Sequence, residues 1–445
     1  MLRLPFQISL FVGLLTLLSA CVAIENPYPK LAPGRWRGVL QVDPSQSSRV
    51  GGKSDQQKER DIQFEEVTEG ELPFEFDVIY DTPDSFHIVL INGEEEIIAS
   101  DILFGLDRRT AKDTLTVNFP LYDSYLEAVC ESGVMQGHWV VNYKENYRIP
   151  FVAKFGEGYR FTQLRKPPAL DLAGTWAVTF QPGEPDAYPA IAEFAQQGNA
   201  LTGTFRTETG DYRFLEGTVQ ANKLYLSCFD GAHAFLFEGK IMEDGSLIGS
   251  FRSGNHYQAY WTAQRDSAFT LADPDNLSRA SDPDQPVLIS FPDSRGNTVS
   301  LEQPEYAGRP VILQIMGTWC PNCLDETRFL RDYLTTHPDI DLPIISIAFE
   351  RYRDAEQVLP LLERYRQRLD LKWPVLWGGY ADKTEASLAL PFLDGLKAYP
   401  TMVFLDREHR IQRIHTGFDG PATSKYKQFA SDFHNFVNRL AGPSQ

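Results

Sequence analysis

The alternation of hydrophobic and polar positions divides the chain into an N-terminal β region and a C-terminal α/β region. From residue 34 to about residue 265, short segments alternate apolar and polar side chains, as in Phe-Glu-Phe-Asp-Val at 74–78, and Gly, Asn and Asp separate them. A period of two residues is typical of strands that bury one face. The sequence therefore predicts an all-β region.

This region contains an internal repeat. Residues 34–39 (Gly-Arg-Trp-Arg-Gly-Val) are similar to 174–178 (Gly-Thr-Trp-Ala-Val), and 135–140 are similar to 247–252. Between them, 115–129 aligns with 224–238, and a polar insert at 43–61, expected to be a disordered loop, accounts for most of the change in spacing. We therefore expect two tandem β-domains.

The boundaries of these domains are predicted at 34–166 and 170–265. Each would be a small barrel or a sandwich, because both architectures give many short alternating strands. The Gly-x-Trp opening weakly resembles a lipocalin-like barrel, which would imply that the Trp closes one end.

After a linker at 266–285, rich in Asp, Pro, Ser and Asn, the pattern changes. Apolar runs alternate with helical patterns, which is typical of an α/β domain with a mixed sheet, here predicted at 286–441. The predicted strands are 311–315, 343–349 and 402–405, and the predicted helices are 324–334, 355–369 and 424–440.

The first 21 residues form an export signal. Arg3 precedes an apolar run at 6–18, which is too short to span a bilayer, and Leu-Ser-Ala-Cys follows at 18–21. This ending resembles a bacterial lipobox. The resemblance implies a signal peptide at 1–20, a lipid on the sulfur of Cys21, and a tether at 21–33 that holds an extracytoplasmic protein at the membrane. The alternative is an ordinary cleaved signal.

Composition narrows the possible functions. Of 445 residues 42% are hydrophobic, enough for several cores, and the net charge of −18 argues against nucleic-acid binding.

The five cysteines are too few for a disulfide scaffold. Cys130 and Cys228, flanked by apolar residues, are expected to be buried free thiols, with a bridge between them as the alternative.

Cys320 and Cys323 form a Cys-x-x-Cys pair with redox chemistry as its expected role. The pair follows the strand at 311–315 and opens a helix near Pro321, a residue suited to a first helical turn. A helix N-terminus favours thiolate over thiol, and the three-residue step places both sulfurs on one face. Zinc would need two further soft ligands, and the sequence holds no second Cys-x-x-Cys or Cys-x-x-His. We expect no cofactor besides the cysteine pair.

The segment Ala-Tyr-Pro-Thr at 398–401 precedes a predicted strand. Together with Trp-Cys-x-x-Cys it resembles the thioredoxin fold, and more closely the TlpA/ResA branch of membrane-tethered thiol–disulfide oxidoreductases. The resemblance covers about 287–440, including the hairpin at 291–301. It implies that Pro400 follows a cis peptide bond and shapes the substrate groove.

The resemblance also assigns a role to Glu326, which matches a glutamate near the cysteines in this branch. A carboxylate behind the thiols would relay the proton when Cys323 attacks, and the alternative is a glutamate on the helix surface. Thioredoxin has an aspartate where this chain has Gln314, so proton handling would fall to Glu326 or water. The 77 residues between Cys323 and Pro400 match the helix–strand insertion of TlpA-like proteins.

These features predict a membrane-tethered, extracytoplasmic thiol–disulfide oxidoreductase of the bacterial cell envelope, facing the periplasm. Cys320 would attack disulfides of client proteins and Cys323 would resolve the mixed disulfide, with electrons from an unidentified membrane or periplasmic donor. The β-domains would act as stalk, docking surface or ligand sensor. One alternative is a thiol peroxidase, although Gly317 stands where peroxiredoxins place Thr or Ser. Another is a ligand-binding envelope lipoprotein with a non-catalytic redox domain.

Overall fold

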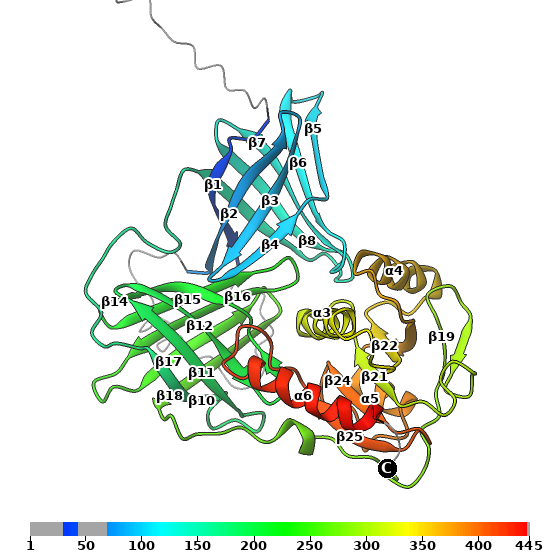
Figure 1. Cartoon of the computed structure of the whole chain (residues 1–445). Helices are drawn as coiled ribbons and strands as arrows, with labels where there is room; N and C mark the ends of the chain where they lie inside the picture. The colour runs from blue at the N-terminus through cyan, green and yellow to red at the C-terminus, as the bar shows by residue number, and fades with distance from the viewer. Residues whose placement is uncertain (1–29, 43–68, 443–445) are drawn as a thin grey trace, which may run out of the picture.

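The computed structural model describes residues 30–42 and 69–442, which form two β-domains and one α/β domain (Figure 1). The predicted signal peptide, Cys21, most of the tether and the polar insert at 43–61 lie outside these ranges. None of the helices within the described ranges is long and apolar enough to cross a membrane.

The first β-domain is a nine-stranded antiparallel sheet in the order β4-β3-β2-β1-β9-β8-β7-β6-β5. Alternation decides which face is buried: in β1, Trp36 and Leu40 are buried, whereas Arg35 and Arg37 are not. β4 and β5 are the two edge strands, and within the described residues no pairing joins them. The sheet is therefore an open half-barrel and not a closed barrel. The strands are β1 (Gly34–Gln41), β2 (Glu71–Thr82), β3 (Ser85–Asn92), β4 (Glu95–Ala99), β5 (Ile102–Asp107), β6 (Lys112–Phe119), β7 (Ser124–Glu131), β8 (Val134–Val141) and β9 (Arg148–Phe155).

The second β-domain is a closed barrel. Its order is β11-β10-β18-β17-β16-β15-β14-β12-β13, and an additional pairing of β11 with β12 closes the sheet. Its interior is rich in aromatic rings, such as Phe205 stacked on Phe237 with centroids 4.3 Å apart. The strands are β10 (Gly174–Phe180), β11 (Tyr188–Gln197), β12 (Ala200–Thr207), β13 (Gly210–Asp211), β14 (Leu215–Gln220), β15 (Lys223–Phe229), β16 (Ala234–Ile241), β17 (Leu247–Ser253) and β18 (Tyr257–Arg265).

The two β-domains have related strand pairings. The first strand of each pairs with the second and the last, β1 with β2 and β9, and β10 with β11 and β18. Trp36 and Trp176 are both fully buried, and each indole N–H donates to the carbonyl four residues earlier, at Ala32 and Leu172, over 2.9 Å. The expectation of two tandem all-β domains is confirmed. The sheet of the first domain is open, and that of the second is closed.

The α/β domain is built on a mixed five-stranded sheet of order β23-β22-β21-β24-β25. Strands β21, β22 and β23 are parallel, and β24 and β25 are antiparallel additions. The elements are β19 (Ser290–Pro292), β20 (Thr298–Ser300), β21 (Val311–Met316), α3 (Pro321–Thr336), β22 (Ile344–Glu350), α4 (Ala355–Arg368), β23 (Val375–Tyr380), α5 (Lys383–Ala389), β24 (Thr401–Leu405), β25 (Ile411–Thr416) and α6 (Tyr426–Ala441).

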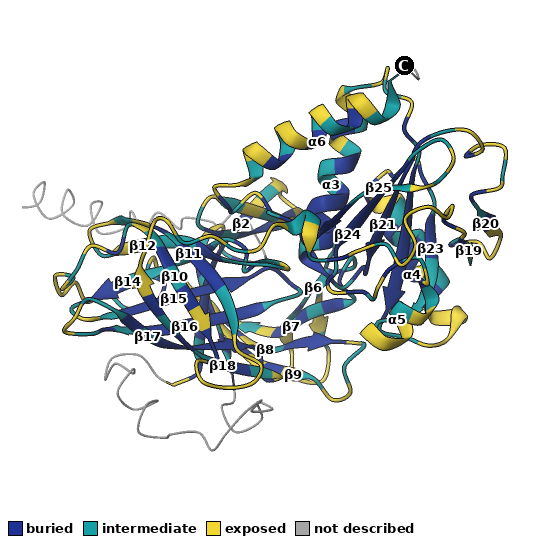
Figure 2. Cartoon of the chain, turned by 90° about the horizontal axis from the view of Figure 1, so that it is seen from below, coloured by how far each residue is buried: buried dark blue, intermediate teal, exposed yellow. Residues whose placement is uncertain are grey.

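Helices cover both faces of this sheet. Helices α3, α4 and α6 share one core with alternate sheet residues such as Ile312 and Phe404. Helix α5 and the β19–β20 hairpin cover the opposite face, around Leu313 and Val403. Figure 2 shows that α6 buries one side and exposes the other, and its buried residues include Phe433.

The predicted strands and helices of this domain are all present. Helix α3 begins at Pro321, as the Cys-x-x-Cys segment predicted, and Cys320 caps it, three residues before the helical pattern that starts at 324. Helix α5 was not predicted. The segment predicted as a linker packs against the domain. Asp275, in a short 3₁₀ helix (Pro274–Asn276), forms an ion pair with Arg413 at 2.8 Å and a hydrogen bond with His415 at 2.7 Å.

Candidate active site

The two cysteines of the Cys-x-x-Cys pair are joined at the start of α3. Cys320 and Cys323 form a disulfide with Cα atoms 5.2 Å apart, within the usual range. Cys320 is the N-cap of the helix, and its sulfur accepts a hydrogen bond of 3.2 Å from the Cys323 N–H. Cys320 is 8% exposed and Cys323 is fully buried. The predicted placement at a helix N-terminus is confirmed, with Cys320 on the accessible side.

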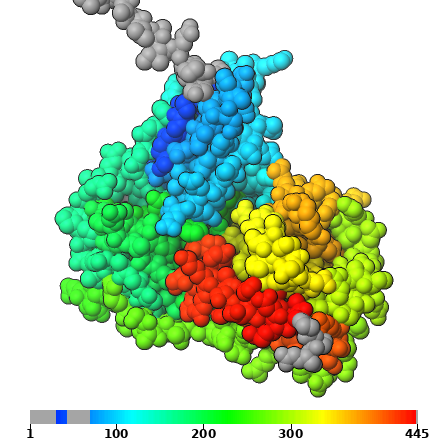
Figure 3. Space-filling view, viewed as in Figure 1, coloured from blue at the N-terminus to red at the C-terminus, as the bar shows by residue number. Residues whose placement is uncertain are grey.

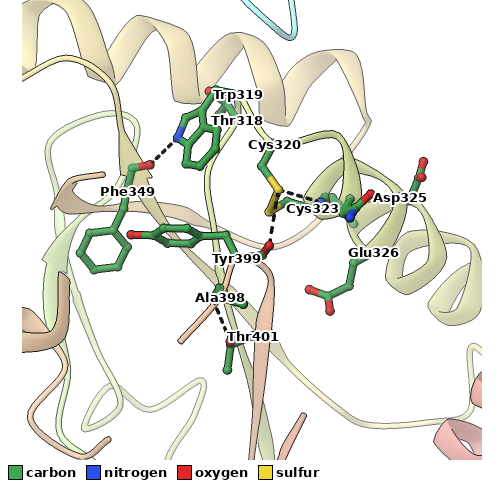
Figure 4. The surroundings of a disulfide bond; sticks show 12 residues. Thr318, Trp319, Cys320, Cys323, Asp325, Glu326, Phe349, Ala398, Tyr399 and Thr401 are labelled. Carbon is green, nitrogen blue, oxygen red and sulfur yellow. Dashed lines mark hydrogen bonds between the residues drawn. A yellow bond between two sulfur atoms is a disulfide. The ribbon is translucent and has the colours of Figure 1, made fainter. Parts of the chain in front are cut away.

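The loop before β24 lies beside this disulfide (Figure 4). The Tyr399–Pro400 peptide bond is cis, as the family resemblance implied. The Tyr399 carbonyl oxygen lies 3.8 Å from the Cys320 sulfur. Backbone of this loop therefore lies next to the cysteine that would meet a client.

Glu326 lies one turn beyond Cys323 on α3 and is fully buried. Its Oε2 accepts a hydrogen bond of 2.9 Å from Gln314 Nε2, and its Oε1 has no partner among the described residues. Burial raises the pKa of Glu326 to about 8, and the bond from Gln314 opposes this only in part. The alternative of a helix-surface glutamate is therefore wrong.

Gln314 connects Glu326 to a buried neutral network. Its Oε1 accepts a hydrogen bond of 2.7 Å from Ser346, and its Nε2 donates to Thr327 over 3.0 Å. The Trp373 indole in turn donates to Ser346 over 2.9 Å. The Glu326 carboxyl behind the cysteines thus lies in a neutral polar environment.

A second buried carboxyl, Glu350 at the end of β22, holds the loop before Cys320, and no sequence pattern had indicated this role. Glu350 accepts hydrogen bonds from the Thr318 N–H at 2.8 Å and the Thr318 hydroxyl at 2.9 Å. The neighbouring Trp319 indole donates to the Phe349 carbonyl over 2.9 Å. Burial raises the pKa of Glu350 to about 7, while the two Thr318 bonds oppose the shift. The end of β22 thereby positions the loop that carries Cys320.

The second β-domain contacts the start of α3. Asn322, between the two cysteines, donates to the Asp211 carbonyl over 3.2 Å, and the Asp211 carboxylate accepts a bond of 2.9 Å from the Gly420 N–H. Arg213, 3% exposed, pairs with one carboxylate from each domain. These partners are Glu95, Asp230 and Asp325. In the space-filling view both β-domains reach the α/β domain (Figure 3).

Among the described residues, the other cysteines and the histidines form no such site. Cys130 and Cys228 are both free, so the bridge considered as an alternative is wrong. Burial raises the pKa of Cys130 to about 12, which keeps the thiol protonated. Across residues 30–42 and 69–442, no group of three or more His, Cys, Asp or Glu side chains is arranged to hold a metal ion.

The sheet, its flanking helices and the paired cysteines at the start of α3 define the class of the C-terminal domain, a thioredoxin-like thiol–disulfide oxidoreductase. In agreement, residues 279–429 match the Redoxin family model. Over 144 residues the chain is 25% identical to "Thiol-disulfide oxidoreductase ResA" of Halalkalibacterium halodurans, a match covering 32% of this chain and 71% of that protein. The C-terminal domain is therefore related to the ResA-type enzymes.

Two solved structures are also similar to part of the chain. A thiol:disulfide interchange protein of the thioredoxin family from Chlorobium tepidum TLS is 19% identical, covering 37% of this chain and 100% of its own, with a TM-score of 0.28. A DsbF homologue from Corynebacterium diphtheriae is 18% identical, covering 39% of this chain and 99% of its own, with a TM-score of 0.29.

Proposed function

We propose that this protein is a membrane-tethered, extracytoplasmic oxidoreductase that reduces disulfides in client proteins. The observation that supports it most directly is the Cys320–Cys323 pair at the N-terminus of α3, beside the Tyr399 carbonyl. The tether would be a lipid on Cys21. A membrane or periplasmic donor would return the pair to the dithiol form.

In the reduced protein the Cys320 thiolate attacks one sulfur of a client disulfide. The client disulfide breaks, a mixed disulfide forms with Cys320, and the second client sulfur leaves as a thiolate. Cys323 then attacks the Cys320 sulfur, which releases the client thiol and closes the Cys320–Cys323 disulfide. Two electrons pass from the cysteine pair to the client.

Two further residues support these steps. Glu326, ionised, accepts the proton that Cys323 loses as it attacks, a role that suits a buried carboxyl with a raised pKa. Pro400 and the carbonyl before it form one side of the groove in which the client backbone lies.

Insulin reduction with dithiothreitol as the donor tests the activity, using the protein without residues 1–21 beside Cys320→Ser and Cys323→Ser. We expect turnover in the parent and its loss in both variants. A glutathione titration of the pair should give a potential near that of thioredoxin, about −270 mV, whereas about −120 mV would identify an oxidant. A pair that neither cycles nor reacts would overturn the proposal.

The tether has a separate test. Cells that express the full chain should incorporate labelled palmitate into it, and Cys21→Ala should abolish the incorporation and release the protein from the membrane fraction. An unlabelled parent chain would contradict the lipid anchor and leave the redox proposal standing.

A further inference from the structure

A cavity of about 570 Å³ lies where the three domains meet, beside the residue that precedes Cys320. Its volume is typical of pockets that bind small molecules or a few side chains. The first β-domain contributes Tyr143 and Lys144, and the second β-domain contributes most of the wall. The α/β domain contributes Trp319, Arg351 and Tyr380.

Aromatic rings form the wall from the second β-domain. The Tyr212 ring lies 5.4 Å from Phe235 and 4.8 Å from Phe251, centroid to centroid, and its hydroxyl is 2.9 Å from the Tyr188 hydroxyl. The His233 ring stacks on Phe235 at 4.3 Å. This wall offers flat apolar surface with a few polar groups at its edge.

The opposite wall carries two cations held on aromatic faces. The Arg351 guanidinium lies 3.9 Å from the centroid of Trp319, and Lys144 Nζ lies 4.5 Å from the centroid of Tyr147. Lys144 Nζ is also 3.3 Å from His256 Nδ1. Burial, with a contribution from Arg351, lowers the pKa of Lys144 to about 8.

In the described part of the chain neither Lys144 nor Arg351 has a carboxylate within ion-pair distance, although the whole chain carries a net charge of −18. The buried carboxylates nearby have other partners: Glu350 binds Thr318, and Asp230 faces His233 and Arg213. Partly desolvated cations without a counterion are costly, and a bound anion offsets that cost.

The cavity is physically connected to the cysteine pair. Trp319 lines the cavity and directly precedes Cys320, and its ring lies 5.6 Å from that of Tyr399 in the loop beside the disulfide. On the other side, Tyr212 sits between Asp211 and Arg213, the two residues that contact the start of α3. A client held at Cys320 would therefore have part of its chain at the mouth of this cavity.

We propose that the cavity binds a client segment in which an acidic residue neighbours an aromatic one, near the cysteine that Cys320 attacks. The carboxylate would pair with Lys144 and Arg351, and the ring would pack against Tyr212 and Phe235. Because Trp319 lines the cavity and directly precedes Cys320, the pair is expected within a few residues of the client cysteine. This inference rests on the proposed function and adds a substrate preference to it.

Single-turnover reduction of synthetic peptides tests the preference. Each peptide carries one cysteine in a disulfide with 2-mercaptoethanol and an Asp-Phe pair three residues before or three residues after it. The counterparts carry Asn-Phe. The full chain, reduced with dithiothreitol and freed of it, gives up two electrons per turnover, releasing 2-mercaptoethanol and then the peptide thiol. We expect one Asp-Phe peptide to react about tenfold faster than its Asn-Phe counterpart, which corresponds to about 1.4 kcal/mol.

The variant that removes both cations, Lys144→Gln with Arg351→Gln, should reduce the preference to about twofold or less. The peptide rates of this double variant are divided by its rate with hydroxyethyl disulfide, a small neutral substrate that does not need the cavity, to correct for any change in basal activity. A melting curve of the variant shows whether it is folded. Lys372→Gln, at an exposed position, is the matched control and should keep the full preference.

Two results would overturn the inference while hydroxyethyl disulfide is still reduced: equal rates for Asp-Phe and Asn-Phe peptides in the parent, or a preference that survives in the double variant. Failure to reduce hydroxyethyl disulfide at all would overturn the proposed function instead.

Discussion

Replacing Glu326 by Gln removes the fully buried carboxyl that lies behind the cysteine pair and changes the size of the side chain little. In the folded, oxidised protein burial raises the pKa of Glu326 from 4.5 to about 8. The folded state therefore binds more protons at this residue than the unfolded state does between these two values. As pH rises through that window, the free energy of unfolding must fall.

The magnitude follows from the shift. Each pKa unit corresponds to about 1.4 kcal/mol, so between pH 5 and pH 8 the parent protein should lose roughly 3–4 kcal/mol of stability at this one residue. In Glu326→Gln no group titrates at this position, so the variant should not lose this stability. Relative to the parent, the variant should therefore gain roughly 3–4 kcal/mol of stability over the same range.

Urea unfolding of the oxidised protein and of the variant, at pH 5 and at pH 8, measures this difference. All other groups titrate in both proteins, so their contributions cancel when the two are compared at each pH. Glu356→Gln, on the exposed side of α4, controls for the loss of one negative charge. A difference between parent and Glu326→Gln that stays constant within about 1 kcal/mol would show that Glu326 ionises like an exposed carboxyl.

The same substitution has a kinetic consequence in the proposed mechanism. Release of the client from its mixed disulfide should accelerate with pH around a midpoint near 8, because Glu326 accepts a proton only when ionised. In Glu326→Gln this inflection should vanish and the rate at pH 8 should fall about 100-fold, the lower range for general-base catalysis. Rapid-quench measurement of the mixed disulfide tests this, and an unchanged profile would remove Glu326 from the mechanism.

Three further substitutions probe how the domains hold the site. Arg213→Met removes the buried cation that three carboxylates share and should cost about 3–5 kcal/mol in urea unfolding, with part recovered in the double variant that adds Asp325→Asn. No recovery would mean that packing, and not charge, holds these contacts. Glu350→Gln weakens the hold on Thr318 and should cost about 1–3 kcal/mol while slowing insulin reduction; equal activity would contradict a positioning role. Trp176→Ala leaves a cavity in the core of the closed barrel and should cost about 3–5 kcal/mol in thermal unfolding, whereas a change under 1 kcal/mol would show that the barrel does not depend on this side chain.

The chemistry of the cysteine pair was predictable because it depends on local order in the chain. A strand, a short loop and a helix that begins at Pro321 place Cys320 at the helix N-terminus whatever else surrounds it. The period of two residues likewise predicted the strands of both β-domains, since alternation alone decides which face of a strand is buried. The burial of Glu326 was not decidable, because a position three residues beyond Cys323 on a helix can face a core or solvent.

The sequence pattern could not predict which distant segments pair or contact each other. Alternating strands are the same in an open and a closed sheet, so only the pairing of β11 with β12 distinguished the barrel from the half-barrel. The linker at 266–285 lacks an apolar period, yet Asp275 binds Arg413 and His415 through polar contacts that leave no periodic signal.

The sequence by itself thus determined the class of chemistry, the order of the domains and the residues that would exchange electrons. Tertiary structure alone decided what surrounds them: the burial that raises the pKa of Glu326, the contact of Asp211 and Arg213 with α3, and the cavity beside Trp319. The physical reason is that redox chemistry needs two sulfurs within one helical turn. Burial and charge pairing depend instead on side chains from other segments, which for Arg213 and Asp325 lie 112 residues apart.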